Sequence, residues 1–198
     1  MRKSIVLLRN ENDALPVKPE TKIYFESLQR NARPDQPVQA NIFASDDNQY
    51  PVKFVKKPAE SDLVILWAIP TGNALFGSTG TPISVSLSKN SIDVDYINKI
   101  SAGKPTILVI NYTNPWVIDE VYNDKTKANI KGVLATFGTT TDALLDVITG
   151  KFNPSGKMPF ATPVSDAAVE SQKEDVPGYL EGEGYALFKY DEGISYKQ

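Results

Sequence analysis

The sequence predicts an α/β fold: a doubly wound sandwich with a mostly parallel sheet and helices on both faces. Two observations predict the sheet, since DLVILWAI (62–69) and TILVINYT (106–113) are continuously apolar, as expected for parallel strands covered on both faces. A third predicts the helical layers, because amphipathic segments with capping residues alternate with the strands. A βαβα order is typical of helices wound around a parallel sheet.

The other strands follow from composition and alternation. KIYFESL (22–28) is rich in β-forming residues and follows a break at Pro16 and Pro19. VKFVKK (52–57) alternates apolar and polar residues, which predicts a half-buried edge strand. IKGVLATF (130–137) is a further buried candidate.

Three segments are predicted helices. SIDVDYINKIS (91–101) has Asn90 or Ser91 as its N-cap. NPWVIDEVYN (114–123) has Asn114 as N-cap and Pro115 at its first position. TTTDALLDVITG (139–150) begins with capping residues and ends at Gly150, a natural left-handed residue. Residues 166–173 favour a short fourth helix.

Ligands of such sheets bind beyond the carboxyl ends of the strands. The loops that start near Trp67, Tyr112 and Phe137 should therefore open on one common edge.

Composition excludes several classes of chemistry. The 198 residues include no Cys and no His, which removes thiolate sites, a Ser-His-Asp triad and His-ligated zinc. Acid–base work must come from carboxylates, Lys or Tyr. A net charge of −3 argues against a nucleic-acid or anionic-membrane partner. We expect no metal and no cofactor.

No segment approaches the roughly 18 apolar residues of a membrane span. The apolar run Ile5 to Leu8 is too short for a signal-peptide core. The compartment stays open between a secreted or periplasmic and a cytoplasmic location.

Glycine-rich stretches raise the question of a nucleotide site. WAIPTGNALFGSTGTP (67–82) has Gly72, four residues, then Gly77. A P-loop needs a Lys where Ser78 stands and a helix directly afterwards. GEGYALF (182–188) lacks both the spacing and the preceding strand of a dinucleotide fingerprint. Neither stretch predicts a nucleotide site.

Several motifs, in order along nearly all of the chain, resemble the C-terminal domain of family 3 glycoside hydrolases. IVLLRNENDALPV resembles its opening, KPTILVINYTNPWVIDE a later strand and helix, and FKYDEGISY its end. The most specific match is GVLATFGTTTDALLDVITGKFNPSGKMPFATP. The resemblance implies an α/β sandwich, usually six-stranded, that packs beside a (β/α)₈ barrel on the same or a separate polypeptide. We interpret residues 1–198 as that single C-terminal domain, without the barrel.

The resemblance also implies where the catalytic groups would lie. The family's nucleophilic Asp belongs to the barrel, commonly in a Ser-Asp-Trp context, and no Ser-Asp pair here precedes Trp. In many members the sandwich supplies the acid/base Glu from the loop after its second strand. Here Leu63 to Ile92 contain no carboxylate. Glu181 and Glu183, on either side of Gly182, are weak candidates for a relocated acid/base, and solvated carboxylates are the alternative.

Candidate substrate-binding residues are Trp67, Asn73 and Phe76. Trp67 is first a core or interdomain aromatic and second a platform for sugar stacking. Asn73 and Phe76 either contact a sugar together with the barrel or only shape their loop. Helix capping and packing explain Asn114 and Trp116 first. Residues 153–156 predict a fixed turn against the barrel or sheet, Lys157 a surface or salt-bridge residue, and the tail a strap on a neighbouring domain.

Three functions remain. In the first, the chain helps to form the substrate cleft of a β-glucosidase- or β-xylosidase-like enzyme and is inactive alone, with a β-glycoside as substrate. In the second, it is a stand-alone module that binds carbohydrate or protein. The third, a flavodoxin-like nucleotide or flavin binder, depends on topology alone.

Overall fold

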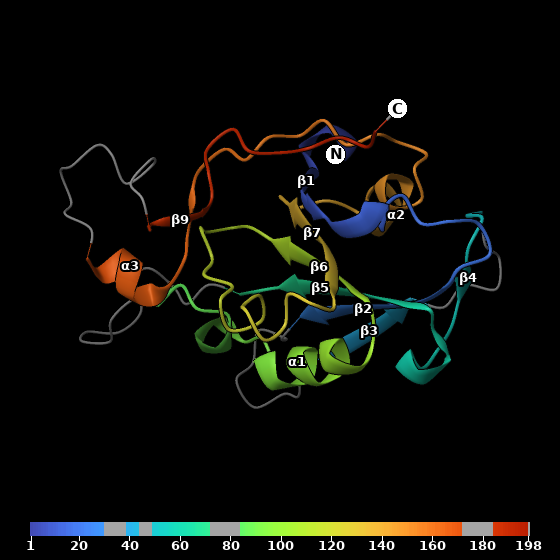
Figure 1. The fold of residues 1–198 in the computed structure, drawn as a ribbon, viewed down its shortest axis with the longest axis horizontal. Helices are drawn as coiled ribbons and strands as arrows, with labels where there is room; N and C mark the ends of the chain where they lie inside the picture. Colours follow the sequence, from blue (N-terminus) through green and yellow to red (C-terminus); the bar gives the residue numbers. More distant parts are fainter. Residues whose placement is uncertain (30–38, 44–48, 72–83, 172–183, 198) are drawn as a thin grey trace.

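In a computed structural model, residues 1–29, 39–43, 49–71, 84–171 and 184–197 are described, and they form an α/β sandwich around one large sheet (Figure 1). Six strands lie in the order β1-β7-β6-β5-β2-β3, and a seventh, β4, pairs with β2. Their bounds are β1 Val6–Asn10, β2 Lys22–Gln29, β3 Gln39–Phe43, β4 Lys53–Phe54, β5 Leu63–Ile69, β6 Thr106–Asn111 and β7 Ile130–Thr136.

The centre of the sheet is parallel, as predicted. β2, β5, β6 and β7 pair in parallel, with Val64 opposite Thr106 and Asn111 opposite Thr136. The two outer strands β1 and β3 run antiparallel to β7 and β2. Sequence reasoning did not predict either of them as a strand. The expected edge strand at 52–57 forms, but only β4 within it has strand pairing.

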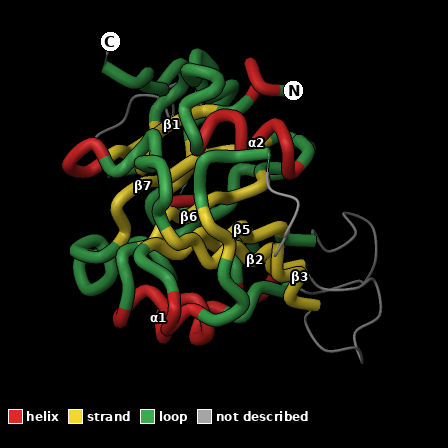
Figure 2. The backbone as a smooth tube through the Cα atoms, turned by 90° about the vertical axis from the view of Figure 1, so that its right-hand side faces the viewer, coloured by secondary structure: helices red, strands yellow, loops and turns green. Residues whose placement is uncertain are grey.

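Alternate residues of the strands serve two separate cores. On one face, Leu66, Leu108 and Val133 pack with Ile97 of α1 (Val94–Gly103). On the other face, Val109 packs with Leu144 and the rest of α2 (Thr141–Ile148). Figure 2 shows the two helices on opposite sides of the sheet. Each fully buried aliphatic side chain contributes about 1.5–3 kcal/mol through removal from water.

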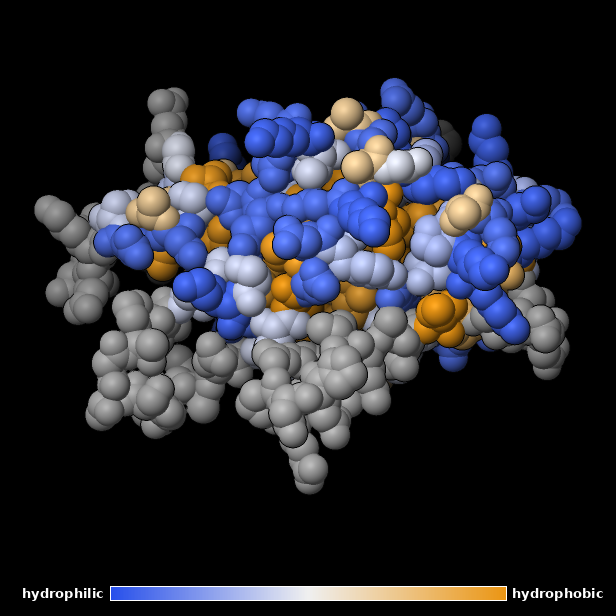
Figure 3. Space-filling view, turned by 90° about the horizontal axis from the view of Figure 1, so that it is seen from below, coloured by the Kyte–Doolittle hydropathy of each residue, from blue (hydrophilic) through white to orange (hydrophobic). Residues whose placement is uncertain are grey.

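Hydrophilic residues cover most of the face seen in Figure 3, the underside on which α1 lies, with hydrophobic residues visible between them. No helix within the described ranges combines the length and apolar character that a membrane crossing requires.

The N-cap of α1 is Asp93, which corrects the prediction of Asn90 or Ser91. The Asp93 carboxylate accepts a hydrogen bond of 2.9 Å from the backbone N–H of Tyr96. Ser91 has a left-handed backbone (φ 71°), and the Asn90 side chain is already bonded to Ser84 and Ser86. Neither residue is therefore free to cap the helix.

The helix predicted at 114–123 is wrong: this segment has an isolated bridge and turns. The backbone N–H of Val117 donates to the carbonyl of Val85, and a parallel bridge joins Val117 to Ser86. The indole N–H of Trp116 donates to the carbonyl of Asn111. The bonds to Val85 and Ser86 hold Val117 in a bridge where local sequence favours a helix, so tertiary contacts override propensity.

α2 forms as predicted within 139–150. The Thr140 side chain accepts a hydrogen bond from the N–H of Ala143, and Gly150 has a positive φ of 78°. A short α3 (Asp166–Glu170) forms within the predicted range 166–173, and Ser165 caps it. A second, two-stranded sheet pairs β8 (Thr162–Pro163) with β9 (Ala186–Phe188).

Residues 153–156 form a fixed connection between the two ends of the domain. The Asn153 Oδ1 accepts from the N–H of Tyr196, and Ser195 donates to the carbonyl of Pro154. Lys157 is exposed and donates to the carbonyl of Gly193, and it forms no salt bridge with a described residue. Within the described part of the tail, Phe188 is fully buried in this domain itself and Tyr190 is 61% exposed. Packing of the tail as a strap on a neighbouring domain stays a prediction.

Candidate functional site

The carboxyl ends of three central strands lie side by side at one edge, as the loop positions predicted. β5 ends at Ile69, β6 at Asn111 and β7 at Thr136, all in parallel register. Because β1 is antiparallel to β7, with Val6 opposite Ala135, the first residues of the chain reach the same edge. α3 and β9 lie beyond the tips of β5 and β6 in Figure 1. Segments distant in sequence thus meet at this edge.

A buried hydrogen-bond network joins the three strand ends. The Trp67 Nε1 donates to the Thr136 Oγ1 over 3.2 Å, although β6 lies between their strands. The Thr136 hydroxyl lies 3.1 Å from the Asn111 Oδ1, and the N–H of Gly138 donates to the same oxygen over 2.9 Å. Gly138 has a positive φ of 67°, and the bond from its N–H to Asn111 holds the turn that leads into α2.

Trp67 lies within the core at this edge. It is 6% exposed and stacks with Phe25, with ring centroids 6.4 Å apart. Both its ring and its N–H therefore have partners inside the domain. This position agrees with the interpretation as a core aromatic, while contact with a sugar stays a prediction.

Asn90 holds together Thr71 and Ser84, which lie near the two ends of the segment between β5 and α1, and we call this contact the neck. Asn90 is 1% exposed, and its Nδ2 donates to the carbonyls of Ser84 (2.9 Å) and Ser86 (2.7 Å). Its own carbonyl accepts from the N–H of Thr71. One side chain and its backbone thus hold both ends of the segment. Asn73 and Phe76 lie outside the described residues.

An aromatic cluster lies on the α1 side of the edge. Tyr112, Phe137 and Phe160 have ring centroids 6.0–6.2 Å apart. The Tyr112 hydroxyl is enclosed and has no hydrogen-bond partner in the described part of the chain, and burial raises the pKa of this phenol. The cluster holds the starts of the loops after β6 and β7 together.

Described carboxylates near this edge include those of the loop after β6, of α3 and of the start of α2. The Asp166 carboxylate accepts from the hydroxyl of Ser84 over 3.1 Å. Burial, and then the charges of Glu120 and Asp166, raise the pKa of Asp119. Glu120 accepts from the N–H and hydroxyl of Ser88. The weak acid/base candidates Glu181 and Glu183 lie outside the described residues.

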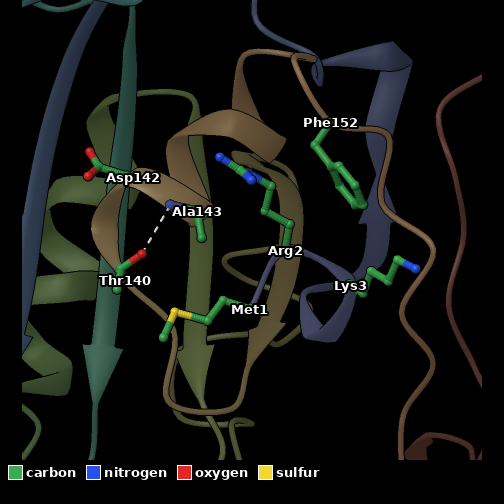
Figure 4. A pocket seen from close by; sticks show the side chains of 7 residues that line it. All are labelled: Met1, Arg2, Lys3, Thr140, Asp142, Ala143 and Phe152. Carbon is green, nitrogen blue, oxygen red and sulfur yellow. Dashed lines mark hydrogen bonds between the residues drawn. The ribbon is translucent and has the colours of Figure 1, made fainter.

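No group of three His, Cys, Asp or Glu side chains within the described ranges could hold a metal ion. A shallow hollow of about 480 Å³ opens beside the chain's first residues and the start of α2 (Figure 4). Its lining residues are Met1, Arg2, Lys3, Thr140, Asp142, Ala143 and Phe152. Arg2 is paired with the buried Asp146 of α2, so this wall of the hollow is fixed.

Sequence reasoning found Trp67 but missed its polar partners. Asn111 and Thr136 are buried polar residues at the ends of mostly apolar strands. That pattern is the signal that could have identified them, because a buried polar side chain needs a partner. Asn114 and Trp116 were predicted to lie in a helix. Trp116 lies outside any helix, is buried, and donates its indole N–H to the carbonyl of Asn111.

Comparison with known proteins gives consistent relatives. Probable beta-glucosidase C of Aspergillus flavus is 32% identical over 199 residues, which cover 98% of this chain and 28% of that protein. The periplasmic beta-glucosidase/beta-xylosidase of Dickeya chrysanthemi is 27% identical and is matched over 88% of this chain and 24% of its own length. The chain thus spans about 28% of the length of the first of these relatives.

Solved structures show the same fold. A β-glucosidase from Chaetomella raphigera superposes with a TM-score of 0.68 at 18% identity, over 100% of this chain and 35% of that one. The β-glucosidase of Listeria innocua in complex with isofagomine gives 0.63 at 17% identity, over 98% and 32%. The family model described as glycosyl hydrolase family 3 C-terminal domain matches residues 5–196. The chain therefore belongs to the family of C-terminal domains of family 3 glycosyl hydrolases.

Proposed function

We propose that this domain forms one wall of the substrate cleft of a family 3 β-glycosidase, beside a (β/α)₈ barrel that carries the nucleophile. The observation that supports it most is the common edge, where the carboxyl ends of β5, β6 and β7 and the first residues of the chain lie. A domain attached ahead of residue 1 would join this one at the same edge. The names of the relatives, β-glucosidases and a β-glucosidase/β-xylosidase, support a gluco- or xylo-configured β-glycoside as substrate.

The positions of the carboxylates indicate how the catalytic roles are divided between this domain and the barrel, and we call this the division of labour. Retaining hydrolysis needs a nucleophile and an acid/base about 5–5.5 Å apart. Residues 63–92, which span the loop after β5, contain no Asp or Glu. On this proposal the domain binds and shapes the cleft but supplies no acid/base from that loop, and the isolated chain does not turn over.

A chimera tests this function. In it, this chain replaces the matching part of the Aspergillus flavus relative, and the assay uses dinitrophenyl β-glucoside with and without azide. Dinitrophenolate leaves without protonation, and azide attacks the glycosyl–enzyme without a general base. We expect release by the chimera with strong azide stimulation, and none by the isolated chain. A folded chimera that releases no dinitrophenolate would contradict the proposal.

The weak candidates Glu181 and Glu183 have their own test. If one of them is a relocated acid/base, Glu181→Gln or Glu183→Gln lowers the chimera's activity without azide and leaves the azide-dependent reaction intact. If neither is, both variants keep the parent's rates under both conditions. Azide-independent turnover by the isolated chain that either substitution abolishes would overturn the division of labour.

A further inference from the structure

Asn111 occupies the centre of the carboxyl edge. It is the last residue of β6, which lies between β5 and β7. Its side chain is 7% exposed, and its backbone carbonyl accepts the indole N–H of Trp116 over 3.1 Å. Pairing with Thr136 of β7 and this indole bond hold the residue in place.

The directions of the hydrogen bonds around Asn111 are fixed by groups that can only donate. An indole N–H has no acceptor capacity, so Trp67 donates to the Thr136 Oγ1. The Thr136 hydroxyl proton then points to the Asn111 Oδ1 at 3.1 Å, a better distance than the 3.5 Å to the carbonyl of Ile110. The backbone N–H of Gly138 is also donor-only and lies 2.9 Å from that oxygen.

Two donors on one side of the amide determine which atom is oxygen. The Nδ2 and its two protons therefore face away from Thr136 and Gly138. None of the described residues accepts a hydrogen bond from this nitrogen, nor is it one of the enclosed, unpartnered side-chain atoms. The Asn111 amide is thus a donor of fixed orientation that keeps an open side at the edge.

We propose that the Asn111 Nδ2 binds a hydroxyl or ring oxygen of the glycoside in the cleft, which deepens the proposed function and rests on it. A donor held by two bonds loses little entropy when it meets an acceptor, and such preorganisation is what a sugar contact needs. No Lys or Arg in the described ranges hydrogen-bonds to this network. The network therefore favours a neutral acceptor over a carboxylate or phosphate, which cationic partners bind best.

The substitution Asn111→Asp removes the N–H donor and leaves the rest of the hydrogen-bond network in place. The carboxylate keeps an oxygen for Thr136 and Gly138 but has no N–H to donate. In the chimera with dinitrophenyl β-glucoside and azide, we expect KM to rise about threefold to tenfold with kcat little changed, as for loss of one uniform binding contact. An unchanged KM in a variant with the parent's thermal midpoint would overturn the assignment.

Asn123→Asp is the matched control. The Asn123 Oδ1 likewise accepts a backbone N–H, from Lys125, but its Nδ2 is already bonded to the carbonyl of Asp119. This variant should cost stability without changing KM. An equal rise in KM in both variants would show a general loss of structure and would contradict a specific role for Asn111.

The isolated chain provides a readout that does not need catalysis. In ¹⁵N-labelled protein titrated with methyl β-glucoside, the Asn111 side-chain N–H₂ signals should shift in a saturable way, and those of Asn123 should not. Shifts confined to other residues, or none up to the solubility limit, would overturn the Asn111 proposal. If the amide shifts while a folded chimera is inactive, the sugar contact stands and the catalytic setting fails, so the two failures are distinguishable.

Discussion

Tyr96 of α1 donates a hydrogen bond of 2.7 Å to the Oε2 of Glu26, a carboxylate at the centre of β2 that is only 1% exposed. Tyr24, two residues earlier on the same strand, donates to the same oxygen over 2.6 Å. A buried carboxylate is stable only when hydrogen bonds replace its hydration. These two phenols provide them, and the Tyr96 bond ties α1 to the sheet.

This arrangement predicts a loss of stability in alkali. Burial first, and then the hydrogen bond to Glu26, raise the pKa of Tyr96 to about 12, and the same causes raise the pKa of Tyr24. Since the folded-state pKa of Tyr96 lies above the unfolded value of 10.0, its contribution is complete below pH 10 and is lost as the pH rises towards 12. Denaturant midpoints measured across this range should fall together with the appearance of tyrosinate absorbance.

Substitution isolates the contribution of Tyr96. Tyr96→Phe should have a smaller alkaline loss than the parent, although not none, because burial also raises the pKa of Tyr50 to about 12. The control is Tyr190→Phe, since Tyr190 is 61% exposed. An alkaline loss in Tyr96→Phe as large as that of the parent would show that the phenol pair is not responsible.

Gly156→Ala should destabilise the whole domain. A Cβ at Gly156 would lie 2.5 Å from the carbonyl oxygen of Ile5 and 3.0 Å from that of Lys3, and backbone atoms cannot move aside as a flexible side chain can. We expect a loss of about 1–3 kcal/mol or more in the free energy of unfolding, the range for overpacking. This would show why the family motif has glycine at this position: the turn contacts the backbone just before β1 directly.

Gly103→Ala is the opposite control. A Cβ at Gly103 would meet nothing within 4 Å, and the residue ends α1. Alanine there should be neutral or stabilising by up to about 1 kcal/mol, because glycine is a poor helix former. Urea unfolding measures the free energy of unfolding of both variants and of the parent. Equal stabilities of Gly156→Ala and the parent would exclude the contact as a constraint.

Much of the fold could be predicted because its central strands are continuous apolar runs. The residues of β5 and β6 are almost entirely buried, so their pattern carries the signal directly. β1 and β3 lacked such a signal. In β1, Leu8 is followed by the polar Arg9 and Asn10, and β3 is the short QANIF, in which Gln39 and Asn41 interrupt the apolar residues. Their strand state comes from pairing with β7 and β2, which the local sequence does not encode.

The candidate site was less predictable for a related reason. Trp67 stands out in any sequence, but Asn111 was read only as part of an apolar run. Its role depends on Thr136 and Gly138, which lie 25 and 27 residues away in the chain. The false helix at 114–123 has the same origin, since Val117 is held by Val85 from a distant loop.

Asn90→Ala should loosen the neck of the segment that follows β5. The substitution removes both bonds from Nδ2 and leaves the carbonyls of Ser84 and Ser86 without this donor. Leaving buried acceptors unsatisfied costs about 1–3 kcal/mol. We expect that loss in the free energy of unfolding, and faster hydrogen exchange at the Thr71 N–H, which donates to the carbonyl of Asn90.

For comparison, the Asn129 Nδ2 makes one exposed bond, to the carbonyl of Ala102. Asn129→Ala should therefore cost no more than about 0.5–1.5 kcal/mol and leave exchange at Thr71 unchanged. Slow exchange at Thr71 in Asn90→Ala would mean that other contacts hold the neck closed.

Tyr112→Phe and Tyr196→Phe form a matched pair that tests the cost of an unpartnered hydroxyl. The Tyr112 hydroxyl is enclosed without a partner, whereas the Tyr196 hydroxyl donates to the carbonyl of Val147 over 2.8 Å. Burial raises the pKa of both phenols. Removing an unsatisfied polar group is neutral or favourable, whereas removing a bonded one costs about 1 kcal/mol.

Chemical denaturation should therefore give Tyr112→Phe a stability equal to or above the parent's and Tyr196→Phe a lower one. A clear loss in Tyr112→Phe would show that its hydroxyl makes a bond in solution, and the carboxyl edge would then have a second anchored polar group beside Asn111.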